Sequence, residues 1–401
     1  MPTTPSQPAG VPYPSSIFFP ASAFQPAGTQ ASAVSEDVSP ALQLRAVTGL
    51  ESESNVLRTR DNRISDTALL LGVGLRMDKR LHLQRLRADI EANTYRYNKE
   101  SSLDYNVFNY ALAWDWSVTP RFHGVAAADR KQYREVLTDP VLLVNRVGRR
   151  TERTELVEGV YEAGAVLRLS GALTHTKAES SEPGSWDGSP DITSVRVGVG
   201  YERPSGASLY GRYRSGHGEY TDPTPGAPSG TFREDEADLL LKWPVSGKTS
   251  IDARLGHLQR KHDAGSQLDF SGMVGSAAVS WDVTGKTRLV AGVSRDLSGS
   301  GLATGGHVLN DRIFIGPTWK ATAAVAVQVR YDFVSRAWQD VAGGSPESGR
   351  KDTVHVLSAS VEWQPRRWVS LSGYVRGEQQ DSNLDTGYRN TTVGAALKTF
   401  F

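Results

Sequence analysis

The side chains that could do chemistry in this chain of 401 residues are mainly charged ones that alternate along short segments. Arg330 lies two residues before Asp332, and Asp252 lies two residues before Arg254. Side chains two apart on an extended strand point to the same face. Guanidinium groups offer planar, bidentate donors to carboxylates and phosphates. The pattern therefore predicts either binding sites for anionic solutes or a lattice of mutual ion pairs.

Catalytic and metal-binding motifs are weaker than this charge pattern. The eight histidines are scattered without HExxH spacing, and the chain has neither a G-x-S-x-G elbow nor a phosphate-binding P-loop. Without any Cys, disulfides, Cys-based metal sites and thiol nucleophiles are excluded. We therefore expect no catalytic residue, no metal and no cofactor. A hydrolase with side chains at the rim of a barrel is the enzyme alternative.

Composition favours β structure. The chain has 39 Gly, 14 Tyr, 11 Phe and 9 Trp but only 3 Met, a balance that suits strands. No apolar run approaches the ~18 residues of a membrane-spanning helix, which excludes a helical membrane protein. The formal net charge of +1, without a polybasic run, gives no reason to expect nucleic acid as a partner.

Period-two alternation is the dominant pattern from about residue 40 onward. In one example, the residues that share a face are Phe108, Tyr110, Leu112, Trp114 and Trp116. Similar apolar faces recur to the end of the chain, including the uncharged face of Val325, Val327 and Val329, and most of them end in an aromatic residue. The sequence therefore predicts a succession of strands, each with one apolar face.

Short turns and long polar loops alternate between these strands. Short turns are expected near residues 77–80, 118–121, 170–171, 203–206, 244–248, 284–286, 321–323 and 364–367. The longer connections include 130–156, 179–191, 215–232, 297–309 and 339–351. Eight turns interleaved with nine loops would give about 18 strands with both chain ends on the short-turn side. On length alone, 130–156 is the best candidate for a segment that folds into a lumen.

This anatomy is typical of outer-membrane barrels, which have short periplasmic turns and longer external loops. A β-sandwich or a propeller would also alternate, but we find no repeated blade motif. A soluble protein would have to bury the aromatic residues that end each strand, whereas a membrane protein places them at the two interfaces. We predict an all-β fold, a single transmembrane antiparallel barrel over residues 40–401, in the bacterial outer membrane.

The two chain ends carry different signals. Residues 1–39 are rich in Pro, Ser and Ala and should be largely disordered, and they lack the positive region of a standard signal peptide. A leader and a misplaced start site both stay open. The last residues, 391–401, alternate and end on Phe401. We expect this aromatic terminus to be the signal that the barrel-assembly machinery reads.

The charged residues fall on the strand faces opposite to the apolar ones, so they would line the lumen. Counted from the turns, the basic residues nearest mid-height are Arg87, Arg196, Arg212, Arg214, Arg254, Arg330 and Arg376. A ring of guanidinium groups at a constriction would select anionic solutes. The alternative is that these residues pair with lumen acids and keep the barrel in shape.

Several short segments also resemble a known family. They are 50–57 (Leu-Glu-Ser-Glu-Ser-Asn-Val-Leu), Ser65-Asp-Thr67, Tyr95-Arg-Tyr97 and Leu112-Ala-Trp-Asp-Trp116. From about residue 40 to its end, the chain resembles the exosortase-associated, EpsL-type outer-membrane barrels of exopolysaccharide-biosynthesis clusters. The resemblance implies export of a newly made polysaccharide and no catalytic residues. The implied partners are the polysaccharide, outer-membrane lipid and periplasmic polysaccharide-export components. A substrate-specific or general uptake porin is the alternative function.

Overall fold

The computed structural model describes residues 41–138, 145–181, 189–221, 230–263, 265, 269–299, 306–341 and 348–401. The predicted disordered segment 1–39 lies outside these residues. The strands are β1 (Leu42–Glu53), β2 (Asp66–Leu81), β3 (Gln84–Tyr97), β4 (Tyr105–Thr119), β5 (Phe122–Thr138), β6 (Asn145–Glu162), β7 (Leu167–Ser180), β8 (Pro190–Glu202), β9 (Ser208–Tyr220), β10 (Thr231–Ser246), β11 (Thr249–His262), β12 (Phe270–Asp282), β13 (Thr287–Gly299), β14 (His307–Lys320), β15 (Val325–Gln339), β16 (Lys351–Arg366), β17 (Val369–Ser382) and β18 (Tyr388–Phe400). A 3-10 turn, η1 (Ser101–Leu103), precedes β4.

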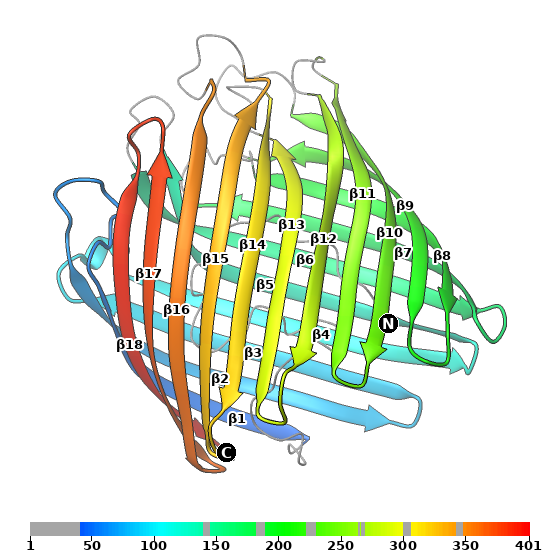
Figure 1. Ribbon diagram of the computed structural model, residues 1–401, viewed down its shortest axis with the longest axis horizontal. Helices are drawn as coiled ribbons and strands as arrows, with labels where there is room; N and C mark the ends of the chain where they lie inside the picture. The colour runs from blue at the N-terminus through cyan, green and yellow to red at the C-terminus, as the bar shows by residue number, and fades with distance from the viewer. Residues whose placement is uncertain are drawn as a thin grey trace.

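These strands form one closed antiparallel sheet. Each strand pairs with the next in the chain, and β1 pairs with both β2 and β18, which closes an 18-stranded barrel. In Figure 1 the strands β11–β18 form the near wall and β2–β7 lie behind them. The predicted fold class and strand number are confirmed. No helix in the described part of the chain is long and apolar enough to cross a membrane.

Short turns and longer loops alternate as predicted, from the two-residue turn at 82–83 to the loop at 340–350. Two predicted turns are wrong. Residues 77–80 lie inside β2, which turns instead at His82, a residue with a positive φ of 54°. Residues 170–171 lie inside β7, and the turn falls at 163–166, around Gly164. In both cases small or polar residues within a strand were mistaken for a turn.

The predicted long loop 130–156 is also wrong, because most of it is strand. β5 and β6 pair with each other from Phe122 and Tyr161 up to Thr138 and Asn145. The sequence hides this hairpin because polar and apolar residues mix on both faces of its outer part, so neither face is consistently apolar. That property is expected where neither face meets lipid, and the hairpin indeed departs from the barrel wall, as described below.

The outer face of the barrel carries exposed apolar side chains, such as Leu71, Val197, Leu255 and Val393. Exposed aromatic residues gather near the short turns: Trp114, Phe122, Tyr161, Tyr201, Trp243, Trp281, Trp319, Trp363 and Trp368. Other outward aromatics are sparser: Phe108 lies near the loop end of β4, and Tyr213 and Tyr331 lie in the middle of β9 and β15. An apolar outer band bordered by a girdle of aromatic residues is typical of a membrane-spanning barrel.

The chain end lies at the seam of the barrel. Phe401 follows the last strand residue, and its backbone exchanges hydrogen bonds with Leu44 of β1 (N–H to O, 2.8 Å; Leu44 N to Phe401 O, 3.0 Å). Its side chain is exposed on the outer face, beside the short-turn end. Its role as an assembly signal stays a prediction, since these contacts show only where the residue lies.

Changing Phe401 to Ser should leave synthesis intact and lower the amount of inserted barrel. The backbone pairing with Leu44 survives this change, so the seam itself should still close. The measurement is the fraction of membrane protein with heat-modifiable migration on gels. Phe400→Ser is the matched control, because it removes the neighbouring aromatic without altering the terminal residue. A wild-type inserted fraction for Phe401→Ser would count against a terminal signal.

Candidate functional site

The inner face of the barrel carries the charged side chains, and on β8–β11 they form a continuous lattice. Arg212 bonds Asp238 of β10 through two nitrogens, at 2.8 and 2.6 Å. Arg254 bonds the same carboxylate from the other side at 2.9 Å and also contacts Glu236. Arg214 lies 2.8 Å from Glu236. The acids of β10 therefore sit between arginines of β9 and β11, and each carboxylate is shared.

Neighbouring strands extend this lattice. Arg196 of β8, in register with Arg214, bonds Glu158 of β6 at 3.1 Å, and both partners are buried. Toward the long loops, Arg260 bonds Glu234 at 2.9 Å and lies 4.1 Å from the ring centre of Phe232. Guanidinium groups bound by two carboxylates, such as those of Arg214 and Arg254, hold their geometry more firmly than a singly paired group.

The remaining predicted arginines lie apart from this lattice. Arg330 bonds Asp332 on its own strand, β15, at 2.8 Å, and Arg312 of β14 bonds the same acid at 3.0 Å. Arg376 bonds Glu378 on β17 at 3.2 Å.

On the other wall, Arg87 of β3 bonds Asp115 of β4 at 2.8 Å. The side chains of Arg87 and Arg330 are 32% and 33% exposed, whereas that of Arg212 is 8% exposed. Arg87 and Arg330 are therefore the more accessible to a solute in the lumen.

All seven predicted arginines face the lumen, but they do not form one ring. Arg212, Arg214 and Arg254 converge on the acids of β10, with Arg196 beside them. Every one of the seven has a carboxylate partner. The arrangement is that of an ion-paired scaffold in which a few guanidinium groups stay open to the lumen. Their role in solute selection stays a prediction.

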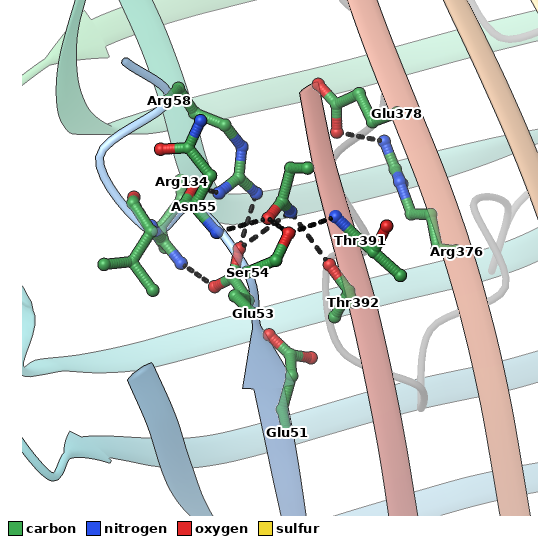
Figure 2. Close-up of polar contacts among 12 residues, drawn as sticks. Glu51, Glu53, Ser54, Asn55, Arg58, Arg134, Arg376, Glu378, Thr391 and Thr392 are labelled. Carbon is green, nitrogen blue, oxygen red and sulfur yellow. Dashed lines mark hydrogen bonds and ion pairs between the residues drawn. The ribbon is translucent and has the colours of Figure 1, made fainter. Parts of the chain in front are cut away.

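A second polar cluster, which the sequence did not reveal as a site, lies at the loop end of the lumen (Figure 2). Its centre is Glu53 at the end of β1, whose carboxylate is 2% exposed. Arg58 and Arg134 bind this carboxylate at 2.6 and 2.5 Å, and both guanidinium groups are themselves buried. Two buried cations thus share one buried anion, an arrangement in which the loss of any partner is costly.

Arg134 belongs to the part of the β5–β6 hairpin that leaves the barrel wall. Strand pairing of β5 with β4 ends at Arg130 and that of β6 with β7 ends at Arg150, yet β5 and β6 continue to pair beyond both residues. Bonds of Gln132 to Asn109 and of Arg149 to Ser181 still join the start of this extension to the wall. Because it no longer follows its wall neighbours, this extension can reach across the lumen. We call residues 131–138 and 145–149 the inner hairpin.

The inner hairpin contacts the first loop, the last loop and the inner side of the wall. Arg134 donates to the carbonyl oxygen of Val56 at 2.8 Å and lies 5.3 Å from the ring centre of Tyr97 on β3. Asn145 donates to the carbonyl oxygens of Arg58 and Thr386, at 2.7 and 3.0 Å. The inner hairpin therefore crosses the inner side of β2–β4 and docks on the first and last loops.

The first loop, residues 54–65, supplies the docking surface. Val56 is fully buried against Leu70, Tyr95 and Tyr97 on the inner wall. Arg58 has a positive φ of 55°, an uncommon conformation outside glycine, and its backbone and side chain both donate to the carbonyl oxygen of Asn55. A strained residue held by several bonds is a fixed anchor rather than a mobile loop position.

The same loop is tied to the last strand (Figure 2). Asn55 donates its backbone N–H to the side chain of Asn390 at 2.9 Å and its side-chain amide to the carbonyl oxygen of Arg389 at 3.0 Å. Ser54 accepts from the backbone of Thr391 at 2.8 Å. Sequence analysis singled out the segment 50–57, but only because it resembles a known family and not as part of a site. Arg134 was hidden because its segment read as a loop.

The described residues contain no group of His, Asp and Glu side chains that could hold a metal ion. The tyrosines and carboxylates of the loop-end cluster bond one another, as Tyr388 does with Glu378 and Tyr374 does with Glu51. The arrangement of charged side chains and the inner hairpin can narrow the passage through the barrel and select solutes by charge.

Comparison with known proteins agrees with this description of the fold. A family described as "Putative beta-barrel porin 2" matches residues 243–400. No curated protein is detectably similar to the chain. The crystal structure of Pseudomonas aeruginosa OccK1 (OpdK) superposes with a TM-score of 0.50 at 13% identity, over 90% of this chain and 99% of that one.

Two further structures are similar over the same share of this chain. P. aeruginosa OccK2 (OpdF) has a TM-score of 0.49 at 11% identity, with 97% of that chain covered. Acinetobacter baumannii OccAB3 has a TM-score of 0.48 at 10% identity, with 99% covered. The chain is a porin-like β-barrel of the bacterial outer membrane. Membership of the EpsL-type family is not confirmed by these matches.

Proposed function

We propose that this barrel is a passive uptake channel for small, preferentially anionic solutes. The observation that carries the proposal is the inner hairpin, which departs from the wall at Arg130 and Arg150 and docks on Glu53 and the first loop. A buried ion-pair anchor favours a permanent restriction of the passage. Such a restriction suits molecules the size of a metabolite better than a growing polymer.

The porin match over residues 243–400 supports the same proposal. Polysaccharide export, which the EpsL-type resemblance implies, is the second candidate. It would require the inner hairpin to move aside, because a polymer chain has to pass at the place where the hairpin crosses the lumen. The two candidates therefore differ in the size of solute that the resting barrel admits.

Solute passage through vesicles that contain the purified protein tests this difference. We expect hexose-sized carboxylates to enter faster than neutral sugars of equal size, and a linear acidic polysaccharide to be excluded. Empty vesicles and vesicles with heat-unfolded protein are the controls. Rapid passage of the polysaccharide through the wild-type barrel would overturn the uptake proposal and favour export.

Charge selection should depend on the accessible arginines. Arg87→Gln combined with Arg330→Gln should shift the reversal potential under a salt gradient toward cation selectivity, because each change removes a lumen cation that is about one-third exposed. Asp115→Asn, which neutralises the partner of Arg87, should shift it in the opposite direction. Reversing the charge of Arg254 is a poorer test, since a Glu there would face Glu236 and Asp238. Reversal potentials that stay unchanged in both variants would mean that Arg87 and Arg330 stabilise the barrel and do not select solutes.

A further inference from the structure

Basic side chains border the barrel at its short-turn end. Seven of the eight short turns carry, within three residues, a lysine or arginine that forms no ion pair with another described residue; the exception is 163–166. These residues are Lys79, Arg80, Arg121, Arg203, Lys248, Lys286, Lys320, Arg366 and Arg367. All of them are exposed except Lys320, which is half-buried. We call these nine residues the basic rim.

The acids nearest the short turns are already paired with other arginines. The pairs are Asp78 with Arg85 at 2.6 Å, Asp282 with Arg288 at 2.6 Å, and Glu162 and Glu202 with Arg168, at 3.5 and 3.6 Å. Because the last two acids share one arginine, a single acid is left over against the nine cations of the rim. The next acids along the strands, such as Asp252 and Glu362, lie on the lumen face. The outer border of this end is therefore strongly positive.

The basic rim lies directly below the aromatic girdle. The guanidinium group of Arg203 is 5.9 Å from the ring centre of the exposed Tyr201, and Arg367 directly precedes the exposed Trp368. Trp and Tyr side chains mark the level of the lipid headgroups. All rim residues belong to turns or strand ends at one end of the barrel, so this placement does not depend on strand tilt. The rim therefore stands in or just beyond the headgroup layer, on the side that is periplasmic in barrels with this anatomy.

The rim surrounds the barrel, which indicates a partner that does the same. Adjacent short turns are two strand widths apart, about 10 Å, which is close to the ~8 Å screening length at physiological salt. Cations on different turns therefore act largely independently of one another. A folded protein would cover one sector of this ring, whereas lipid contacts every strand. Lysine and arginine are also the side chains that bind phosphate groups.

We propose that the basic rim binds the headgroups of anionic phospholipids, such as phosphatidylglycerol, in the leaflet that faces the periplasm. The phosphate of such a lipid lies near the level of the girdle, within reach of a long lysine or arginine side chain. A net anionic headgroup is favoured over a zwitterionic one, because the zwitterion brings its own cation to the rim. These contacts lie on the outside of the barrel, at the end opposite to the inner hairpin, so the inference goes beyond the proposed uptake.

Quenching of tryptophan fluorescence by brominated lipids tests the proposal on the full-length protein in vesicles of phosphatidylcholine and phosphatidylglycerol. The girdle contains six exposed tryptophans, so quenching reports which lipids contact it. At equal mole fractions, brominated phosphatidylglycerol should compete for these contacts about fivefold better than brominated phosphatidylcholine. Fivefold corresponds to about 1 kcal/mol, the attraction of one basic residue to an anionic lipid surface. The preference should disappear at about 1 M salt, where the screening length is roughly 3 Å.

Two multiple variants locate the lipid preference. The rim variant should lower it to about twofold, because it neutralises the cations beside four of the girdle tryptophans. Its substitutions are Lys248→Gln, Lys286→Gln, Arg366→Gln and Arg367→Gln. The matched control makes the same types of change at exposed positions of the loop end and should keep the wild-type preference. Its substitutions are Arg63→Gln, Arg233→Gln, Lys261→Gln and Lys351→Gln.

Equal quenching by the two lipids in the wild type would overturn the proposal, as would a wild-type preference in the rim variant or an equal loss in the control. Heat-modifiable migration shows that each variant is folded. The reversal potential under a salt gradient separates this result from the channel proposal, and it should stay at the wild-type value in the rim variant. A shifted potential with an unchanged lipid preference would overturn the lipid as the ligand and place the rim in the path of the permeating anions.

Discussion

Replacing Glu53 with Gln should lower the free energy of unfolding by about 3–5 kcal/mol, because it leaves the buried cations Arg58 and Arg134 without their shared anion. It should also raise the single-channel conductance, since Arg134 anchors the inner hairpin to β1 through this carboxylate. Urea unfolding followed by tryptophan fluorescence, and conductance in planar bilayers, are the two measurements. If Glu53 only stabilised the barrel, the substitution would lower the free energy of unfolding and leave the conductance unchanged. A rise in conductance therefore reports movement of the inner hairpin.

Two other variants make this result interpretable. Glu219→Gln makes the same chemical change at an exposed outward position of β9 and should stay within about 0.5 kcal/mol of the wild type. Asn145→Ala removes the bonds from the hairpin to Arg58 and Thr386 without leaving a buried charge unpaired. It should raise conductance with a smaller loss of stability. Wild-type conductance in both Glu53→Gln and Asn145→Ala would mean that the inner hairpin does not restrict the passage.

Replacing Val329 with Arg should cost about 2–4 kcal/mol, the cost of a cation that faces lipid near the bilayer midplane. Val329 is an exposed apolar residue on the outward face of β15. Gln328→Arg, one residue away and facing the lumen, should cost little and is the matched control. Refolding equilibria in lipid vesicles measure both. Similar costs for the two variants would mean that the assigned faces of this strand are wrong.

The cost of an arginine on this face of β15 should depend on its depth in the bilayer. Val327, which shares the apolar face, pairs with Trp319 and Val361 and lies close to Trp363, within the aromatic girdle at the short turns. An arginine there could extend toward the interface, and its cost should be lower than that at Val329. The order Val329, then Val327, then Gln328 would map the depth of the apolar band along a single strand.

The fold was predictable because the lipid imposes one rule on every strand. Outward residues must be apolar, so alternation in segments such as Phe108 to Trp116 reveals strands, and closure follows from the alternation of turns and loops. The rule fails where no face meets lipid. Neither face of the inner hairpin is consistently apolar, and the sequence around Arg134 was therefore interpreted as a long loop.

The candidate site was less predictable, because ion-pair partners depend on register. Arg330 and Arg376 do pair with acids two residues away on their own strands, as simple alternation suggests. Arg87 instead bonds Asp115 across to β4, and Asp89 contacts Arg45 of β1. Glu53 and Arg134 are 81 residues apart. Nothing in local spacing could bring them together; only the order of strands around the barrel does.

The seam between β1 and β18 has a consequence for how the barrel is made. The first loop is bonded to Asn390 and Thr391 of the last strand, and it also carries the anchor for the inner hairpin. That anchor is complete only when the two ends of the chain have met, so the inner hairpin should dock last. A barrel stalled before closure would lack its restriction and would leak solutes that the finished protein excludes. Permeability of the cell envelope during stalled assembly would then report directly on this final step.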